Sequence, residues 1–306
     1  MMQQPLIVCS QEDIAGMNIK RRILQIKSWE RMQIKTTGFK ELYFNKELQS
    51  WVAQIEEPLV QSNHLDEYCK EQGIYPLCYI FASRHKSESA KPALLAHVTG
   101  NWTDDADLGG NPREICIASA NLLRKAYLLL LEEKKKKTEE LSDFSVNVEV
   151  THHGPTNLKY PLLFVELGSN ETYWNNEPGA YAIGRVILRL VSYLKQNNFD
   201  IDLPSKELLG VGIGFGGPHY ASTFDRALRS IPIAFSHIMP KYAVEKVSKE
   251  IVSAMITRTI EKISWFILDW KGLNRAQKDV LIPILETFDS IPIRRAKRMI
   301  KEFEGN

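Results

Sequence analysis

Six of the seven histidines lie at or just after runs of residues that predict β-strands. They are His85, His97, His152, His153, His219 and His237. A neutral imidazole can take a proton from water or bind a metal ion, and histidine titrates close to neutral pH. Taken singly, a histidine is more commonly a hydrogen-bonded structural residue. The shared position of these six therefore predicts one site where several imidazoles meet, with His64 outside it.

Glu166 is the acidic residue that points most directly to this site, because it ends the apolar run LLFVE. A buried carboxylate is costly without a partner, so we expect a histidine, a metal ion or a cationic ligand group beside it. Side chains of the strand before His152 alternate between the two faces of the sheet. If the alternation continues, His152 lies on the face of the apolar side chains, and His153 lies with Glu149 on the opposite face. We predict that four residues position and deprotonate a water molecule: His152, His153, Glu166 and His219.

A metal ion is compatible with this set, because imidazoles and carboxylates are ordinary Zn²⁺ ligands and leave a position open for water. The expected metal ligands are His85, His97 and His237. The sequence has no H-E-x-x-H motif and no C-x-x-C pair, so Zn²⁺ is inferred from convergence alone. Direct acid–base catalysis without a metal remains the alternative.

The segment GVGIGFGGPHY carries five glycines in eight residues and a formal G-x-G-x-x-G pattern. A dinucleotide site does not fit, because Pro218, His219 and Tyr220 follow in place of a helix start. Glycines allow close backbone approach, so their N–H groups can form a nest for an anion or for the oxyanion of ester hydrolysis. We expect the segment 214–217 to play that role, and a tight turn without a ligand is the alternative.

Seven short apolar or β-branched runs, separated by helical runs, predict a sheet that would gather these residues. The expected strands are Leu6–Cys9, Leu77–Ala82, Leu94–Val98, Phe144–Val150, Leu162–Leu167, Leu208–Ile213 and Ile231–Phe235. Continuous apolar runs are typical of strands buried on both faces, which predicts a three-layer α/β fold with a mixed, mostly parallel sheet flanked by helices. Carboxyl ends of parallel strands share one rim, so we expect the histidines to meet there.

The helices are predicted from capping signals and apolar periodicity. Asn111, Pro112 and Glu114 match a capping box with proline at the first helical position, which predicts a helix from Asn111 onward. Further helices are expected at Pro178–Gln196 and Pro240–Lys262. We expect residues 1–306 to form a single α/β catalytic domain. Its last part, residues 273–306, is expected to be a basic helical extension of two short helices broken at Ile291-Pro292.

Composition limits the class of protein further. Lys plus Arg number 39 and Asp plus Glu 37 in 306 residues, so the charge balance gives no global attraction to nucleic acid or membrane. The four cysteines are widely spaced, which does not indicate a disulfide framework and favours a reducing compartment. The N-terminal apolar run is too short for a signal peptide or a membrane span. We therefore expect a cytoplasmic protein without a membrane partner.

Several short motifs together resemble the D-aminoacyl-tRNA deacylases of the archaeal and plant type. They are CSQEDIAGMNI, ASRHKSES, HVTGNW, THHGPT, FVELGSNETYW, GGPHYASTF and HIMPKYA, and they occur in order over about residues 5 to 245. The resemblance implies a fold similar to peptidyl-tRNA hydrolase and purine nucleoside phosphorylase. It also implies hydrolysis of the ester between a D-amino acid and tRNA, and an association with zinc. Substrate binding is expected from Asn101, Gly214, Gly216, Gly217 and Tyr220.

Two other functions remain open. A nucleoside phosphorylase or another hydrolase on the same scaffold would use the glycine-rich segment to hold phosphate. A non-catalytic RNA-binding protein would use the basic cluster Arg294 to Lys301, although that segment lacks interleaved aromatic residues for base stacking. The favoured prediction is a deacylase whose partner is tRNA carrying a D-amino acid, acting as a monomer or weak dimer.

Overall fold

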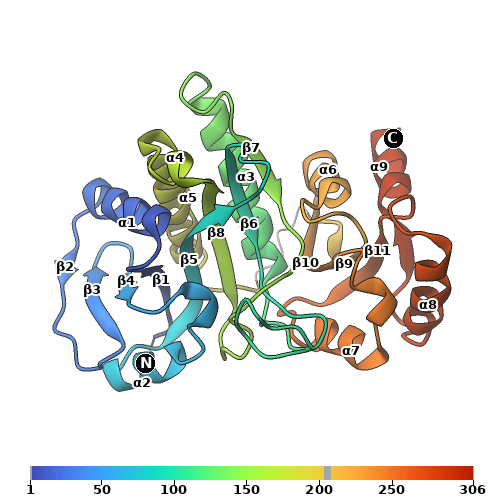
Figure 1. Ribbon diagram of the computed structural model, residues 1–306, viewed down its shortest axis with the longest axis horizontal. Coiled ribbons are helices and arrows are strands. Elements are labelled where there is room, and N and C mark those ends of the chain that lie inside the picture. Colours follow the sequence, from blue (N-terminus) through green and yellow to red (C-terminus); the bar gives the residue numbers. More distant parts are fainter. Residues whose placement is uncertain (1, 203–207, 306) are drawn as a thin grey trace.

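The computed structural model describes residues 2–202 and 208–305, which form two β-sheets with helices packed against them (Figure 1). The larger sheet has the strand order β2-β3-β4-β1-β5-β8-β6-β7 and the smaller has the order β10-β9-β11-β12. Most neighbouring strands are parallel, and β6 runs antiparallel to β8. The predicted α/β class with a mixed, mostly parallel sheet is therefore confirmed.

The strands have the following bounds: β1 Gln4–Ser10, β2 Glu30–Arg31, β3 Phe39–Asn45, β4 Ser50–Ile55, β5 Pro76–Lys86, β6 Ala93–His97, β7 Ser145–Val148, β8 Leu162–Ser169, β9 Gly210–Phe215, β10 Ile233–Met239, β11 Ile263–Leu268 and β12 Ile293–Arg295. All seven predicted strands are present within a few residues. The prediction missed β2, β3, β4, β11 and β12. The central strand β8 is buried along its whole length, as its unbroken apolar run predicted.

The helices are α1 Ile14–Ile26, α2 Leu65–Gln72, α3 Ala120–Lys136, α4 Glu171–Trp174, α5 Glu177–Gln196, α6 Ser222–Ser230, α7 Lys249–Thr257, α8 Arg275–Glu286 and α9 Ala296–Glu304. Short 3-10 turns are η1 Leu59–Gln61 and η2 Val244–Lys246. In the described part of the chain, no helix combines the length and the apolar character needed to cross a membrane.

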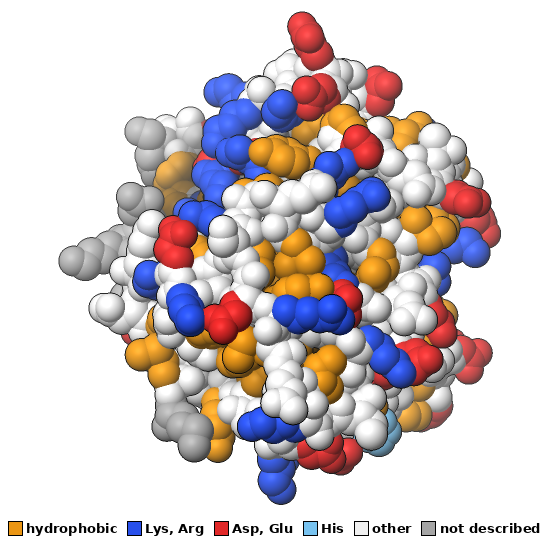
Figure 2. All heavy atoms as spheres, turned by 90° about the vertical axis from the view of Figure 1, so that its left-hand side faces the viewer, with side chains coloured by type: hydrophobic (Ala, Val, Ile, Leu, Met, Phe, Trp, Pro, Cys, Tyr) orange, Lys and Arg blue, Asp and Glu red, His pale blue; other side chains and the backbone are white. Residues whose placement is uncertain are grey.

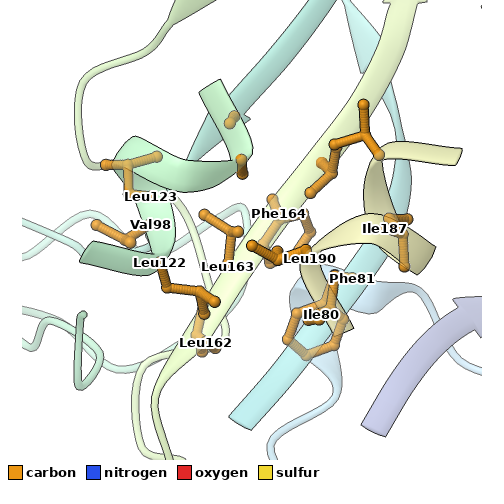
Figure 3. Close-up of a cluster of buried hydrophobic side chains, with 14 of the residues drawn as sticks. Ile80, Phe81, Val98, Leu122, Leu123, Leu162, Leu163, Phe164, Ile187 and Leu190 are labelled. Carbon is orange, nitrogen blue, oxygen red and sulfur yellow. The ribbon is translucent and has the colours of Figure 1, made fainter. Parts of the chain in front are cut away.

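Helix α3 joins the two halves of the molecule. It packs beside α5 and against β6 and β7 of the larger sheet, and it also contacts β10 of the smaller sheet. Side chains of α3 and α5 form one apolar cluster with β5 and β8 (Figure 3), including Leu122, Leu163, Ile187 and Leu190. Burial of such side chains contributes about 1.5–3 kcal/mol each. The relative position of the two sheets therefore depends on this helix.

The prediction of a helix beginning at Asn111 was wrong. Arg113 adopts a positive φ of 53°, and Ile115 pairs with Gly100 as an isolated bridge. The Asn111 side-chain amide donates to the Glu114 carboxylate at 2.7 Å, so these two residues bond each other and do not cap a helix. Helix α3 begins nine residues later, where the Ser119 hydroxyl accepts a hydrogen bond from the Leu122 amide.

The single helix predicted over Pro240–Lys262 was also wrong, whereas Pro178–Gln196 matches α5. Ser248 lies in an extended conformation and caps a separate helix, α7, by accepting from the Ile251 amide. The C-terminal residues form α8 and α9 as predicted, with β12 between them. Because β12 pairs with β11, the last part of the chain supplies a strand of the smaller sheet.

A buried acid at the start of α3 gives a first testable prediction. Glu261 accepts hydrogen bonds from Ser119 Oγ at 2.7 Å and from the amides of Ala120 and Asn121 at 2.9 Å. We expect Glu261→Ala to lower the free energy of unfolding by about 2 kcal/mol, because three donors lose a charged acceptor. Urea denaturation measures this, and exposed Glu139→Ala should change stability by less than about 0.5 kcal/mol. Equal effects of the two substitutions would contradict the role of Glu261.

Candidate active site

Glu166 lies near the middle of β8, with an imidazole on each side. It is paired with Ser83 of β5 and Leu95 of β6, so His85 and His97, two residues further along those strands, project from the same face. Each ring has a nitrogen 3.5 Å from a Glu166 oxygen. The carboxylate is only 3% exposed. The expectation that imidazoles accompany a buried Glu166 is met.

The two neighbours change the acid–base properties of Glu166. Burial alone would raise the pKa of this carboxyl, but the charge of His97 and the contacts with His85 and His97 lower it well below its usual range. The reciprocal effect raises the pKa of His85 and of His97, because contact with Glu166 and the negative charges of Glu166 and Glu149 outweigh the opposing effect of burial. Glu166 is therefore held ionised.

A second buried carboxylate, Glu149, lies in the same cluster and was missing from the predicted site residues. One of its oxygens is 3.0 Å from His219 Nε2 and 3.4 Å from His85 Nδ1, and the other is 3.9 Å from His97 Nε2. Neither oxygen is aligned for a hydrogen bond with any described residue. The signal that would have found it is the one used for Glu166: an acid within an apolar strand run, here VNVEV.

His152 and His153 follow β7 and turn their rings toward His97. Their ring centroids lie 4.3 and 4.9 Å from that of His97 and 4.4 Å from each other. His153 has a φ of 44°, a left-handed conformation that is uncommon for residues other than glycine. Gly100 donates its amide to the carbonyl of His153 at 2.8 Å, which helps to hold this turn.

In His97, His152 and His153 the same ring nitrogen is bonded to the backbone. Nδ1 lies 3.1, 2.8 and 2.7 Å from the carbonyl oxygens of Val98, Val150 and Gly154, respectively. A carbonyl only accepts, so Nδ1 is the donor, and whenever the ring is neutral its lone pair is on Nε2. Burial and neighbouring imidazoles lower the pKa of His152, and they lower that of His153 to about 3. These two rings are therefore neutral.

His219 and Tyr220 reach the cluster from the chain that follows β9 of the smaller sheet. The Val150 amide donates to the His219 carbonyl at 3.0 Å, and Tyr220 forms an isolated bridge with Glu149. The Tyr220 hydroxyl lies 2.9 Å from His85 Nε2, so it contacts a site histidine. The His219 side chain is 43% exposed. It is thus accessible to a substrate while its Nε2 faces Glu149.

Two cavities open on this cluster and share the residues Leu108, His152, His153 and His219. The first, about 320 Å³, is also lined by Asp13, Arg84, His85 and Glu166, and we call it the Arg84 cavity. The second, about 300 Å³, is also lined by Trp102, Asp105, Asp107 and Tyr242, and we call it the Trp102 cavity. The imidazoles therefore form a common wall between two spaces.

The structure leaves some predicted site residues outside this arrangement. His237 is buried on β10 and lines neither cavity, and burial lowers its pKa to about 3. His237 is not among the groups of potential metal ligands found in the described residues. Its position at the end of an apolar run reflected packing in the smaller sheet, so the structure does not support its assignment as a metal ligand.

The predicted oxyanion nest at Gly214, Gly216 and Gly217 is not supported either. Gly214 lies in β9, where a Cβ atom would come within 2.9 Å of the Phe224 ring. The Gly216 amide already donates to the Met239 carbonyl at 2.8 Å. None of the three lines either cavity. These glycines allow close packing and, at Gly216 and Gly217, positive φ values of 100° and 91°.

Asn101 lines the Trp102 cavity, but its side chain also holds the neighbouring loop. Its amide nitrogen donates to the carbonyls of Gly109 at 2.8 Å and Asn111 at 3.1 Å. Leu108 is fixed between the cavities by a hydrogen bond from the Gly154 amide to its carbonyl. Gly109 packs so closely on Val60 that no Cβ would fit. Asn101 therefore positions the segment that carries Leu108.

Potential metal-ligand atoms lie within 4.8 Å of one another in three overlapping groups. They are His97, His152 and His153; His85, Glu149 and His219; and His97, Glu149 and Glu166. The structure thus places His152 and His153, predicted as catalytic residues, beside His97, predicted as a metal ligand. Seven side chains form one continuous cluster.

The ring tautomers give a second testable prediction. ¹⁵N NMR of the metal-free protein at pH 7 should show His152 and His153 neutral and protonated on Nδ1, because a carbonyl accepts from that atom in each ring. Exposed His64 supplies the reference signals of a solvated ring. Protonation on Nε2, or doubly protonated rings at pH 7, would contradict the arrangement described.

Comparison with known proteins identifies the family. A family model described as D-aminoacyl-tRNA deacylase matches residues 73–291. A D-aminoacyl-tRNA deacylase of Methanosarcina acetivorans is 31% identical over 281 residues, covering 92% of this chain and 88% of the relative. One from Pyrococcus furiosus is 32% identical over 270 residues, covering 87% and 91%.

One solved structure shares the fold of this chain. The crystal structure of a conserved protein of unknown function aligns with a TM-score of 0.84 and 28% identity, covering 98% of both chains. A Campylobacter jejuni nucleosidase aligns over 63% of this chain with a TM-score of 0.41. From the family match and the relatives, the chain belongs to the D-aminoacyl-tRNA deacylase family.

Proposed function

We propose that this protein hydrolyses the ester bond between a D-amino acid and tRNA, which frees tRNA charged with the wrong enantiomer. Family membership supports the reaction. The observation that carries the proposal is the cluster of five imidazoles and two buried carboxylates facing two cavities. Ester hydrolysis needs a positioned water, a proton acceptor and room on both sides of the ester, and this wall can provide all three.

We assign the general base to His219, oriented by Glu149. Nε2 of His219 lies 3.0 Å from the carboxylate, so the negative charge of Glu149 favours the proton on that side of the ring and leaves Nδ1 as the acceptor. Water attacks the ester carbonyl carbon and gives its proton to His219. The bond between that carbon and the ribose oxygen then breaks, and His219 returns the proton to this oxygen, which leaves as the ribose hydroxyl. Such catalysis contributes about 10²- to 10⁴-fold in rate.

The donor set fits a zinc ion. His97 Nε2 is buried without a hydrogen-bond partner in the described residues, as are both Glu149 oxygens, and such atoms require a partner. His97, His152 and His153 would hold the ion through Nε2, since their Nδ1 atoms are bonded to carbonyls. A bound Zn²⁺ would supply Lewis-acid polarisation and lower the pKa of water. In this proposal His152 and His153 act as ligands, and Glu166 fixes His85 and His97.

The cellular compartment and the oligomeric state of the enzyme are also part of the proposal. All four cysteines are free and buried, which supports a reducing compartment such as the cytoplasm. The seven site residues come from one chain, so a monomer or weak dimer would be sufficient for the reaction.

The alternatives have less support. In a phosphorylase the glycine-rich segment would hold phosphate, yet the Gly216 amide is already bonded and the segment lines neither cavity. In an RNA-binding protein the C-terminal cations would be free, yet Arg294 and Arg298 pair with Glu302. Arg295 lies over the Trp270 ring at 3.7 Å.

The acid–base assignment gives a third prediction. His219→Ala and Glu149→Gln should each lower turnover of a D-aminoacyl-tRNA by about 100-fold, because the proton acceptor or its orienting charge is lost. Release of free amino acid measures this, and circular dichroism checks folding. His64→Ala, an exposed histidine outside the site, should act at the wild-type rate. A folded His219→Ala variant with full activity would exclude His219 as the base.

Metal content gives a fourth prediction. The protein as isolated should contain zinc by elemental analysis, and dialysis against a chelator should remove both the zinc and at least about 90% of activity. Added Zn²⁺ should restore it. His97→Ala should bind zinc at least about 10-fold more weakly, whereas His237→Ala should keep it. Full activity in a zinc-free sample would leave direct acid–base catalysis as the mechanism.

A further inference from the structure

The two cavities meet only at the wall that carries the imidazoles. Leu108, His152, His153 and His219 line both, and the other lining residues differ. The substrate of the proposed reaction has the same form: an acyl group and a nucleotide joined at one ester. If the ester lies at the shared wall, each cavity receives one arm. The question is which arm each cavity takes.

The Trp102 cavity is acidic and aromatic. Asp105 and Asp107 line it, and no lysine or arginine does. Neither carboxylate has an ion-pair partner among the described side chains, whereas Asp104 in the same loop pairs with Arg113 at 2.7 Å. Trp102 is fixed by donating its indole N–H to the Thr151 carbonyl at 2.6 Å. Two unpaired carboxylates repel phosphate and attract an ammonium group, and aromatic faces also favour cations.

The Arg84 cavity is lined by two cations, Arg84 and Lys86, and by the acid Glu12, whereas no cation among the described residues lines the Trp102 cavity. Arg84 and Lys86 are exposed and line it, and neither forms an ion pair with a carboxylate in the described part of the chain. The nearby Asp13 carboxylate is engaged by the amides of Gly16 at 2.7 Å and Arg84 at 2.8 Å. Phosphate contacts with such residues account for much of nucleic-acid affinity.

Ion pairs neutralise some of the cations on the surface of the molecule. Figure 2 shows the face made by the left-hand elements of Figure 1, where Lys and Arg side chains gather in the upper left and elsewhere lie among Asp, Glu and hydrophobic side chains. In and next to β2, β3 and the end of α1, ion pairs join Lys27 with Glu47, Arg31 with Glu41, Lys40 with Glu56 and Lys46 with Glu30. Such paired cations have little charge left for phosphate. Arg84 donates to the Glu12 carbonyl at 3.3 Å and lies over the Trp174 ring, but neither Arg84 nor Lys86 is neutralised by an ion pair with a described carboxylate. What distinguishes them is their position, because they line a cavity that reaches the site histidines.

Building on the proposed function, we propose that the Trp102 cavity takes the D-aminoacyl group, with its α-ammonium facing Asp105 and Asp107. The Arg84 cavity then takes the terminal nucleotide, with Arg84 and Lys86 facing its phosphate. Leu108 separates the two arms, because Asn101 and the Gly154 amide fix its loop between the cavities. Asp105, Asp107, Arg84 and Lys86 are thus substrate-positioning residues for one reaction.

The test compares two matched esters of tRNA, D-phenylalanyl-tRNA and D-phenyllactyl-tRNA, in which a hydroxyl replaces the ammonium group. The Asp105→Asn/Asp107→Asn variant should reduce the preference in kcat/KM for the amino ester about 10-fold, while hydrolysis of the hydroxy ester changes little. The Arg84→Gln/Lys86→Gln variant should raise KM for both esters about 10-fold and make KM less dependent on salt. Glu139→Gln/Glu140→Gln, which removes two charges beyond the end of α3, is the matched control.

The outcomes separate this inference from the proposed function. Absence of D-aminoacyl-tRNA hydrolysis by the wild-type protein would overturn the function itself. An active wild type whose Asp105→Asn/Asp107→Asn variant keeps the full amine preference would overturn only the assignment of the cavities. The opposite result has two parts: the Arg84→Gln/Lys86→Gln variant loses the amine preference, and the aspartate variant binds tRNA more weakly. It would show that the Arg84 cavity takes the aminoacyl group and the Trp102 cavity takes the nucleotide.

Discussion

Two buried carboxylates constrain the rest of this site. Glu149 is 1% exposed and Glu166 is 3% exposed. An ionised carboxylate removed from water costs several kcal/mol unless opposite charge or donors surround it. The surrounding groups are imidazoles from β5, from β6 and from the chain after β9, so three distant segments must converge for either acid to be tolerated. Loss of one partner would leave a buried charge uncompensated.

The same constraint divides the imidazoles into two kinds. His85 and His97 lie beside the carboxylates, which raise their pKa values despite burial. His152 and His153 lie farther from the negative charge and close to other rings, and their pKa values are lowered. Without a metal ion, the cluster therefore combines rings that favour a proton with rings that stay neutral. Only His219 in the cluster combines substantial exposure with a buried acid at its side.

Much of this arrangement followed from local signals in the sequence. Apolar runs predicted the strands around the site, and Glu166 at the end of such a run predicted histidine partners. Five of the six histidines meet as expected. The shared rim was wrong as their common position, because β6 runs antiparallel to β8 and His97 lies opposite Phe164, away from the carboxyl end of β8. The residues gather on a face of the sheet. Strand direction is set by non-local pairing, which the local pattern does not contain.

Other errors of the prediction from sequence also arise from contacts between segments that are distant in the chain. The capping signals at Asn111 and Glu114 were sound locally, but pairing of Ile115 with Gly100 overrides them. The glycine-rich run serves packing against Phe224 and Ile238, partners that lie later in the chain. Glu149 carries the same local signal as Glu166, but its contact with His219, seventy residues away in sequence, is set by the tertiary fold. The types of residue at the site were predictable, whereas their pairing depended on the tertiary fold.

The most direct test is a double-mutant cycle on turnover of D-aminoacyl-tRNA, using Glu166→Gln in the wild-type and in the His85→Gln/His97→Gln backgrounds. If Glu166 acts through these two rings, its substitution should cost about 100-fold in the wild type and less than about 3-fold once the rings are replaced. Equal costs in both backgrounds would contradict the claim that the buried carboxylates organise the imidazoles.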